Sequence, residues 1–350
     1  MQRVFNVFLM HLDYIMMNDE NQHFLPVNAI GEPLKDISKA GKDRRWKARK
    51  LSSLELAGRL HKLHYRCADN VSICSDVLEF VEKTDGTLRL SRTWNCKNKL
   101  CAICNWRRAL KYSYQSSRII DKAIEEYPKA RFLFLTLTVR NMSAKDLKDD
   151  ITSMSKGFNR LFKYKKVDKN IIGFVRSLEV TRNHDTEEYH PHFHVLLMVK
   201  PTYFKNSENY IPQDEWVELW KKAMKLDYDP VVNIKSVKDT GDKGIEKAIK
   251  ETAKYPLKPF DVEADGQELS EDTKLKITDE IMDGLFRKRQ IGFGKLFKKI
   301  KKELDLDDLE DGDLVNVGSE SDDKSTGKML IAHWNHDMKN YLVVSQKGID

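Results

Sequence analysis

The sequence has no long apolar run and few cysteines. No stretch approaches the roughly 18 uninterrupted apolar residues of a membrane-spanning helix. The oily segment at residues 1–17 is interrupted by His11 and Asp13, and no small-residue cleavage site follows it. Five cysteines in 350 residues are too few for a disulfide scaffold. These absences argue against a membrane protein or a secreted one, and they predict a chain in a reducing cytoplasm.

Charge is plentiful and unevenly placed. Lysine and arginine exceed aspartate and glutamate by 61 − 54 = +7, and 33% of all residues are charged. Basic residues cluster around Trp46, between Lys39 and Lys50, and again between Arg287 and Lys302. Either cluster alone also fits a solvated helix face, but two separate basic tracts favour a polyanion as the partner.

The length predicts two domains or three short ones. Alternating apolar residues predict strands at 131–139, 173–181, 191–199 and 231–238, with helices near 143–165, 215–225 and 244–255 between and after them. This order indicates an α+β fold with a central antiparallel sheet and helices on its faces. We divide the chain into an extension (1–37), a basic, cysteine-rich region (38–118), a central domain (119–258), and an acidic linker with a helical C-terminal region (259–350).

The sharpest feature is the segment Tyr189-His-Pro-His-Phe-His194. In a strand, His190, His192 and His194 point to one face, and alternate residues point into a core. Histidines at this spacing can bind one metal ion. Glu179 on the preceding strand is the expected third ligand if the two strands form a hairpin, with His184 and Asp185 of the connecting loop as alternatives. Two imidazoles and a carboxylate suit Mn²⁺ or Mg²⁺ bound to phosphate oxygen, and zinc or non-haem iron also fits.

A second feature is Glu251-Thr-Ala-Lys-Tyr255. At helical spacing i and i+4, Glu251 and Tyr255 lie on one face. A tyrosine beside a carboxylate can serve as a nucleophile with a nearby general base. Such pairs are common, so the weight of this one comes from following the histidine strand in the same folded unit.

The cysteines form a third group. Cys96, Cys101 and Cys104 have the short spacing of half a structural zinc site, and one upstream cysteine would complete four thiolates. We choose Cys74 over Cys67, because Cys74 leads directly into the predicted strand at 77–81. Reduced buried cysteines are the alternative interpretation.

Several basic residues are candidates for contacts to DNA phosphates, because they lie in the first basic tract, on the helix after the cysteines, or beside the candidate tyrosine. They are Arg44, Arg45, Lys47, Arg107, Arg108 and Lys254.

The motifs, taken in order, resemble those of a known family. Phe134-Leu-Thr-Leu-Thr-Val139, Leu178-Glu-Val-Thr181, His190-Pro-His-Phe-His194 and Glu251-x3-Tyr255 are similar to the ordered motifs of rolling-circle replication initiators of small bacterial plasmids, in the HUH endonuclease superfamily. The likeness extends to Cys74-x3-Leu-Glu-Phe80, to the cysteine group with Arg107-Arg108, and to Arg289-Gln-Ile-Gly-Phe-Gly294. It covers roughly residues 40–345.

The resemblance implies an HUH nickase that cuts and rejoins origin DNA, single-stranded or extruded as a hairpin. Tyr255 would become linked to the 5′ phosphate and release a 3′-OH that primes a host polymerase, with a host helicase as a further partner. His192, His194 and Glu179 would hold the divalent cation. Glu251 would activate water for the terminating cleavage. His190 either supports these ligands without binding the metal itself, or is merely part of the strand.

Two other classes of protein fit parts of the pattern. A zinc-containing DNA-binding regulator that never cuts would use the cysteines and the basic tracts, and would leave the histidine strand without a role. An iron oxygenase would use Glu179, His192 and His194, and would leave Tyr255 without a role. Metal-dependent cutting of origin DNA separates the nickase from both.

Overall fold

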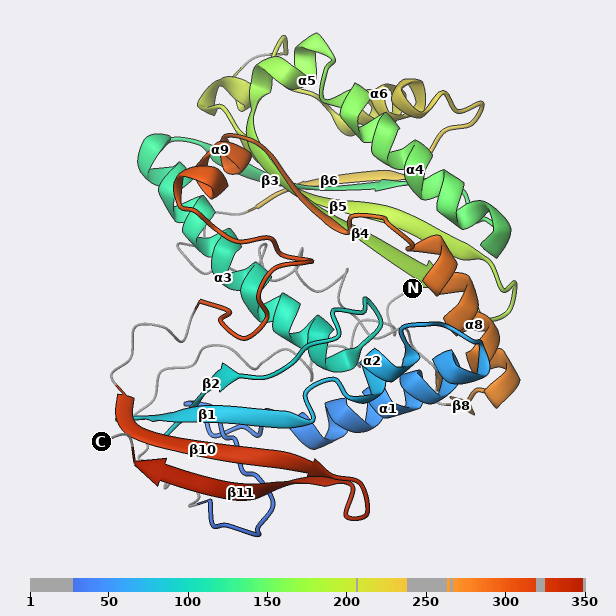
Figure 1. Ribbon diagram of the computed structural model, residues 1–350. Coiled ribbons are helices and arrows are strands. Elements are labelled where there is room, and N and C mark those ends of the chain that lie inside the picture. The colour runs from blue at the N-terminus through green and yellow to red at the C-terminus, as the bar shows by residue number, and fades with distance from the viewer. Residues whose placement is uncertain (1–27, 206, 238–262, 265–266, 319–324, 349–350) are drawn as a thin grey trace.

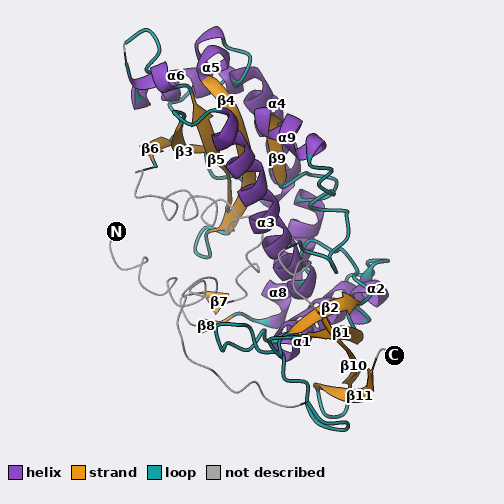
Figure 2. Cartoon of the chain, turned by 90° about the vertical axis from the view of Figure 1, so that its left-hand side faces the viewer, coloured by secondary structure: helices purple, strands orange, loops and turns teal. Residues whose placement is uncertain are grey.

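The computed structural model describes residues 28–205, 207–237, 263–264, 267–318 and 325–348, which form two large antiparallel sheets with helices packed on them (Figure 1 and Figure 2). Glu251, Lys254 and Tyr255 lie outside the described residues, as do residues 1–27 of the predicted extension and the helix predicted at 244–255.

The larger sheet has five strands in the order β6-β3-β5-β4-β9, and all neighbouring strands in it are antiparallel. Period-two apolar patterns produce these strands, since alternate side chains then enter a core on one face. The strands are β3 (Arg131–Thr138), β4 (Ile171–Arg182), β5 (Tyr189–Val199), β6 (Val232–Ser236) and β9 (Ile291–Lys295).

Helices cover both faces of this sheet. One face packs on α4 (Ala144–Leu161), α6 (Gln213–Met224) and α8 (Glu271–Gly284) through a buried apolar cluster. The other face packs on α3 (Ala102–Glu126) and α9 (Leu296–Glu303) through a second buried apolar cluster (Figure 1). The short helices α5 (Lys165–Asn170) and η2 (Pro201–Phe204) lie in the connections. The predicted α+β class with an antiparallel central sheet is confirmed.

The smaller sheet has the order β11-β10-β1-β2 and lies below the first in Figure 1. Its inner face packs on α1, α2 and the start of α3, around Trp46, Phe80 and Tyr341. Its elements are α1 (Trp46–Lys62), α2 (Ala68–Ser72), β1 (Val77–Lys83), β2 (Leu88–Arg92), β10 (Ser325–Asn335) and β11 (Asn340–Gly348). The two-residue strands β7 (Glu263–Ala264) and β8 (Gln267–Glu268) form a separate small hairpin.

The prediction of a separate, helical C-terminal region is wrong in one respect: this part of the chain contributes strands to both large sheets. β9 pairs with β4, and β10 pairs with β1. The reason for β9 lies in its glycines, because a Cβ at Gly294 would overlap the Phe174 ring. The glycines therefore let a strand lie inside the region that was predicted to be helical.

Among the described residues, no helix combines the length and the apolar character needed to cross a membrane.

Candidate metal centres

The hairpin of β4 and β5 brings three predicted ligands together. Its register places Glu179 opposite His192, and His194 lies two residues further along the same face of β5. The Nε2 atoms of His192 and His194 lie 2.7 and 3.0 Å from the same oxygen, Oε2 of Glu179. All three side chains are buried, with 9% or less of their surface exposed. The alternatives His184 and Asp185 are not part of this group.

The hydrogen-bond pattern around His192 favours uptake of a proton or a cation by this cluster. A neutral imidazole carries one N–H. His192 Nδ1 lies 3.1 Å from the carbonyl oxygen of His190, where it can only donate. Nε2 then presents a lone pair to Glu179 Oε2, and two acceptors 2.7 Å apart repel each other. A second proton on His192 or a bound cation removes that repulsion, so the donor set fits a metal ion.

The neighbouring strand β3 supports the second histidine. Thr136 pairs with His194 in the register, and its Oγ1 lies 3.3 Å from His194 Nδ1. Outer partners of this kind fix the orientation of a metal-ligating imidazole. His190 lies outside the three-residue group and pairs with Asn141 Oδ1 at 2.9 Å. Burial lowers the pKa of His190, and the nearby His192 lowers it further.

An anchor that sequence reasoning missed holds the start of the histidine strand. The hydroxyl of Tyr189 donates to Oε2 of Glu280 on α8 at 2.6 Å. Burial and this carboxylate raise the pKa of Tyr189 above its ordinary value, so the phenol stays protonated and keeps donating. Only the position of Tyr189, directly before the histidines, hinted at this role. The partner is 91 residues away in sequence.

The second group consists of Cys74, Cys96, Cys101 and Cys104. The Sγ atom of Cys74 lies 3.6 Å from that of Cys104 and 3.7 Å from that of Cys101, and Cys96 lies 3.6 Å from Cys104. A tetrahedral zinc site with Zn–S bonds of about 2.3 Å has sulfur atoms about 3.8 Å apart, so these spacings fit zinc. Cys67 lies outside the group and contacts Asn98 instead.

The cysteine group shares its protons unevenly. Hydrogen bonds from the Cys104, Cys74 and Cys96 thiols lower the pKa of Cys101 well below its ordinary value. The pKa values of Cys96 and Cys104 are raised, chiefly because each thiol bonds to Cys101. A group that holds one thiolate among buried thiols favours a cation that ionises the others.

Two of the predicted DNA contacts are wrong, because the structure buries them. Arg107 and Arg108 have 0% and 2% of their surface exposed. Arg107 donates to the carbonyl oxygens of Leu314 and Val315 at 2.9 and 2.6 Å, and Arg108 donates to the carbonyl oxygen of Glu310 at 3.3 Å. These guanidinium groups tie α3 to a distant loop and are not available to phosphates.

That loop, which we call the acidic loop (residues 305–317), also encloses Lys111. The Lys111 ammonium contacts Oδ2 of Asp307 at 2.7 Å and the carbonyl oxygens of Asp308 and Asp313 at 2.9 and 2.7 Å. The basic residues Arg107, Arg108 and Lys111 of α3 therefore bind the acidic loop.

The first basic tract keeps exposed charges. Arg45 and Lys47 are exposed at the start of α1, whereas the guanidinium of Arg44 lies half-buried, 3.7 Å from the carboxylate of Asp36. Contact with DNA stays a prediction for these three residues.

A buried group of two histidines and one carboxylate, with four clustered cysteines beside the second sheet, defines an α+β protein with two groups of side chains that could each hold a metal ion. Residues 87–342 match the model of the family described as Replication protein, and the chain belongs to that family. The family membership confirms the resemblance to replication initiators that the ordered motifs indicated.

Curated relatives agree over most of the chain. A protein named "Protein rep" from Streptococcus pneumoniae serotype 2 (strain D39 / NCTC 7466) is 49% identical over 313 residues, which cover 89% of this chain and 95% of the relative. One from Lentilactobacillus hilgardii, with the same name, is 44% identical over 89% of this chain and 98% of its own length. A "Replication protein" from Staphylococcus aureus is 44% identical over 67% of this chain and 99% of its own length. No solved structure matches.

Proposed function

We propose that this replication protein starts rolling-circle replication of a plasmid by nicking one strand of its origin. The observation that carries the proposal is the convergence of His192 and His194 on one carboxylate oxygen of Glu179, on paired strands of the larger sheet. Three ligands leave coordination positions for a substrate oxygen, as catalytic sites require.

His192, His194 and Glu179 would hold Mn²⁺ or Mg²⁺. The ion would draw electron density from the scissile phosphate and stabilise the charge that builds up there. The protein supplies the orientation of the ligands: the His190 carbonyl and Thr136 fix the two imidazoles, and Tyr189 fixes the strand that bears them.

In the proposed reaction, the phenolic oxygen of Tyr255 attacks the scissile phosphorus. The bond from that oxygen to phosphorus forms, and the bond from phosphorus to the 3′ oxygen breaks. One proton leaves the phenol and one is gained by the 3′ oxygen, so the step is a transesterification without net hydrolysis. The products are a 5′-phosphotyrosine and a free 3′-OH that serves as a primer.

We assign Glu251 to termination. As a general base near Tyr255 in sequence, it would take a proton from the water that makes the closing cleavage. We assign zinc to Cys74, Cys96, Cys101 and Cys104, where a closed set of four thiolates has a structural role. The partners would be plasmid origin DNA, single-stranded or extruded as a hairpin, with a host helicase and a host polymerase.

The test uses a labelled origin oligonucleotide and Mn²⁺, with wild type, Tyr255→Phe and Glu251→Ala compared on a denaturing gel after protease treatment. We expect a covalent adduct that disappears in Tyr255→Phe while DNA binding is retained. Glu251→Ala should still nick and should accumulate adduct. If wild type binds the origin tightly and leaves every strand intact with all divalent ions, the protein is a non-cutting zinc-containing regulator.

A further inference from the structure

The edge strand β2 contains an irregularity that re-aims one of its arginines. Arg92 pairs with Glu79 and Arg89 pairs with Val81. Over this stretch β2 therefore contains one residue more than β1, which is a β-bulge. Arg89 and Arg92 are three residues apart and would point to opposite faces of a regular strand. The extra residue, Ser91, puts both on the outer face, and its hydroxyl bonds the Glu79 carbonyl oxygen at 2.9 Å.

On the inner face of the sheet, two buried leucines fix the orientation of β2. Leu88 and Leu90 are 5% and 3% exposed and belong to the core of the smaller sheet. The strand is therefore held by its leucines, and both arginines are directed away from that core. Bulges that re-aim side chains are frequent next to functional sites.

The outer positions of β2 carry two positive charges, of which Arg89 is half-buried and Arg92 is open to solvent. The side chain of Arg92 is 80% exposed and lies 3.7 Å from the carboxylate of Glu79, which is the facing acidic group on β1. Among the described residues, Arg89 makes no ion pair. On the next strand, His333 is exposed and pairs with Val77.

An exposed tryptophan extends this surface. Trp94 lies two residues after Arg92 and has 48% of its surface exposed. The chain stays beside β1 there, because the Ser75 amide donates to the Trp94 carbonyl oxygen at 2.8 Å and the Thr93 hydroxyl donates to the Val77 carbonyl oxygen at 2.6 Å. A large, exposed aromatic side chain two residues after an exposed arginine is a platform on which a base can stack.

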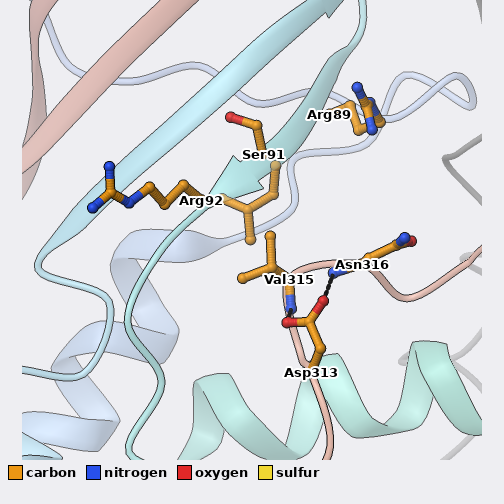
Figure 3. A pocket seen from close by; sticks show the side chains of 7 residues that line it. Arg89, Ser91, Arg92, Asp313, Val315 and Asn316 are labelled. Atoms are coloured by element: carbon orange, nitrogen blue, oxygen red, sulfur yellow. Dashed lines mark hydrogen bonds between the residues drawn. The ribbon is translucent and has the colours of Figure 1, made fainter. Parts of the chain in front are cut away.

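A hollow of about 500 Å³ lies between β2 and the acidic loop, next to both arginines (Figure 3). It is lined by residues 89–92 of β2 and by Asp313, Val315 and Asn316. The Asp313 carboxylate accepts the backbone N–H groups of Val315 and Asn316 at 2.8 and 3.0 Å, which fixes the loop wall. The volume lies within the range of about 300–1,000 Å³ usual for ligand pockets, and the arginine side chains extend away from it along β2 (Figure 3).

We propose that Arg89, Arg92 and Trp94 form a binding site for an unpaired DNA strand, separate from the nick site. The arginines contact phosphates, and Trp94 stacks on a base, which is available only where the strand is not paired. The inference rests on the proposed function in taking DNA as the ligand. Its residues belong to a different sheet from Glu179, His192 and His194, so the two sites can be tested separately.

The test measures the fluorescence anisotropy of a labelled thymidine oligonucleotide and of a duplex of the same length, at several salt concentrations. We expect Trp94→Ala to weaken single-strand binding about tenfold, with Trp94→Phe close to wild type, since phenylalanine still stacks. Replacing Arg89 and Arg92 together by alanine should lower the salt slope by about 1.4, or about 0.7 for each lost phosphate contact. Lys129→Ala, an exposed cation before β3, is the matched control and should bind like wild type.

A second readout locates the contact. Photo-crosslinking with an oligonucleotide that carries 5-iododeoxyuridine should attach DNA to the peptide containing Trp94. Unchanged single-strand binding in both variants together with crosslinks elsewhere would overturn the site, as would a loss confined to duplex binding. The Tyr255 adduct assay is run on the same variants: no adduct in wild type removes the proposed nicking function, whereas normal adduct with unchanged binding removes this site alone.

Discussion

The two metal-ligating groups are built in different ways. Glu179, His192 and His194 lie on paired strands, where register alone sets their separation. The four cysteines come from a loop after α2, a loop after β2 and the start of α3, and only tertiary packing joins them. Three ligands leave room for a substrate oxygen, and four thiolates leave none. On this difference rests our proposal that the first group carries chemistry and the second stabilises the fold.

The largest effect should come from breaking the cysteine group. Cys104→Ala removes one of the four clustered cysteines, and structural zinc contributes about 10–16 kcal/mol of binding free energy to folding in small zinc peptides. We expect loss of the zinc and a fall of several kcal/mol in the free energy of unfolding. Metal analysis and urea denaturation measure the two. Cys67→Ala is the control, because Cys67 lies outside the group, and equal damage from both variants would contradict the assignment.

Breaking the histidine group should affect activity and leave the fold intact. His192→Ala removes one ligand, and we expect nicking to fall about 10²- to 10³-fold, the usual cost of losing one electrostatic stabiliser of the transition state. The free energy of unfolding should change little in metal-free buffer, because the repulsion between His192 Nε2 and Glu179 disappears along with the packing. Gel assays and thermal melts check this. His190→Ala should retain most activity, and a collapse of the melting temperature in His192→Ala would assign the group a structural role.

A smaller effect is expected from the anchor of the histidine strand. Tyr189→Phe deletes the hydroxyl that bonds Glu280 and leaves the ring in place. Loss of one buried hydrogen bond to a carboxylate should cost about 1.5–3 kcal/mol. Nicking should fall by less than in His192→Ala, because the ligands themselves remain. Denaturation of Tyr189→Phe, of Glu280→Gln and of the double variant measures the coupling. Additive losses would show that the two side chains do not interact.

The smallest effect concerns the acidic loop, which contacts α3 and the start of β9. Burial acts to raise the pKa of Asp308, but hydrogen bonds from the Asp311 amide, Arg289 and the Glu310 amide outweigh it and hold that pKa at about 2, against 3.8 ordinarily. The folded-state pKa is depressed, so its stabilisation is full above pH 3.8 and is lost as the pH falls towards 2. Solvent screening of this partly exposed group reduces the contribution to about 1 kcal/mol.

Acid denaturation of Asp308→Asn tests this contribution of the Asp308 carboxylate to the free energy of unfolding. The variant should be less stable than wild type at pH 7, and the two curves should converge near pH 2. A difference that persists unchanged at the lowest pH would mean that packing, and not the charge of Asp308, accounts for the loss.

The local patterns predicted much of the fold and both metal-ligating groups. Alternation along β4 and β5 was sufficient to place Glu179 beside His192, because strand pairing converts sequence spacing directly into distance. Cysteine spacing, with the strand that follows Cys74, was sufficient to choose Cys74 over Cys67.

Long-range contacts were beyond those patterns. Arg107 and Arg108 of α3 were predicted to contact DNA, because nothing nearby in the sequence indicates that a loop about 200 residues later buries them. The pairing of β1 with β10 has the same character, since both strands have ordinary apolar alternation and neither specifies its partner. The bulge at Ser91 belongs to the pairing of β1 with β2, and no sequence motif predicts it.

The pairing of Val77 with His333 has a consequence for synthesis. A ribosome releases the first half of the smaller sheet early and must complete nearly the whole chain before β10 and β11 emerge to join it. Until then α1, β1 and the cysteines have no finished core against which to pack, so the nascent protein cannot mature domain by domain from its N-terminus. A premature stop codon shortly before residue 325 would leave the distant cysteine region incomplete, although every cysteine would still be present.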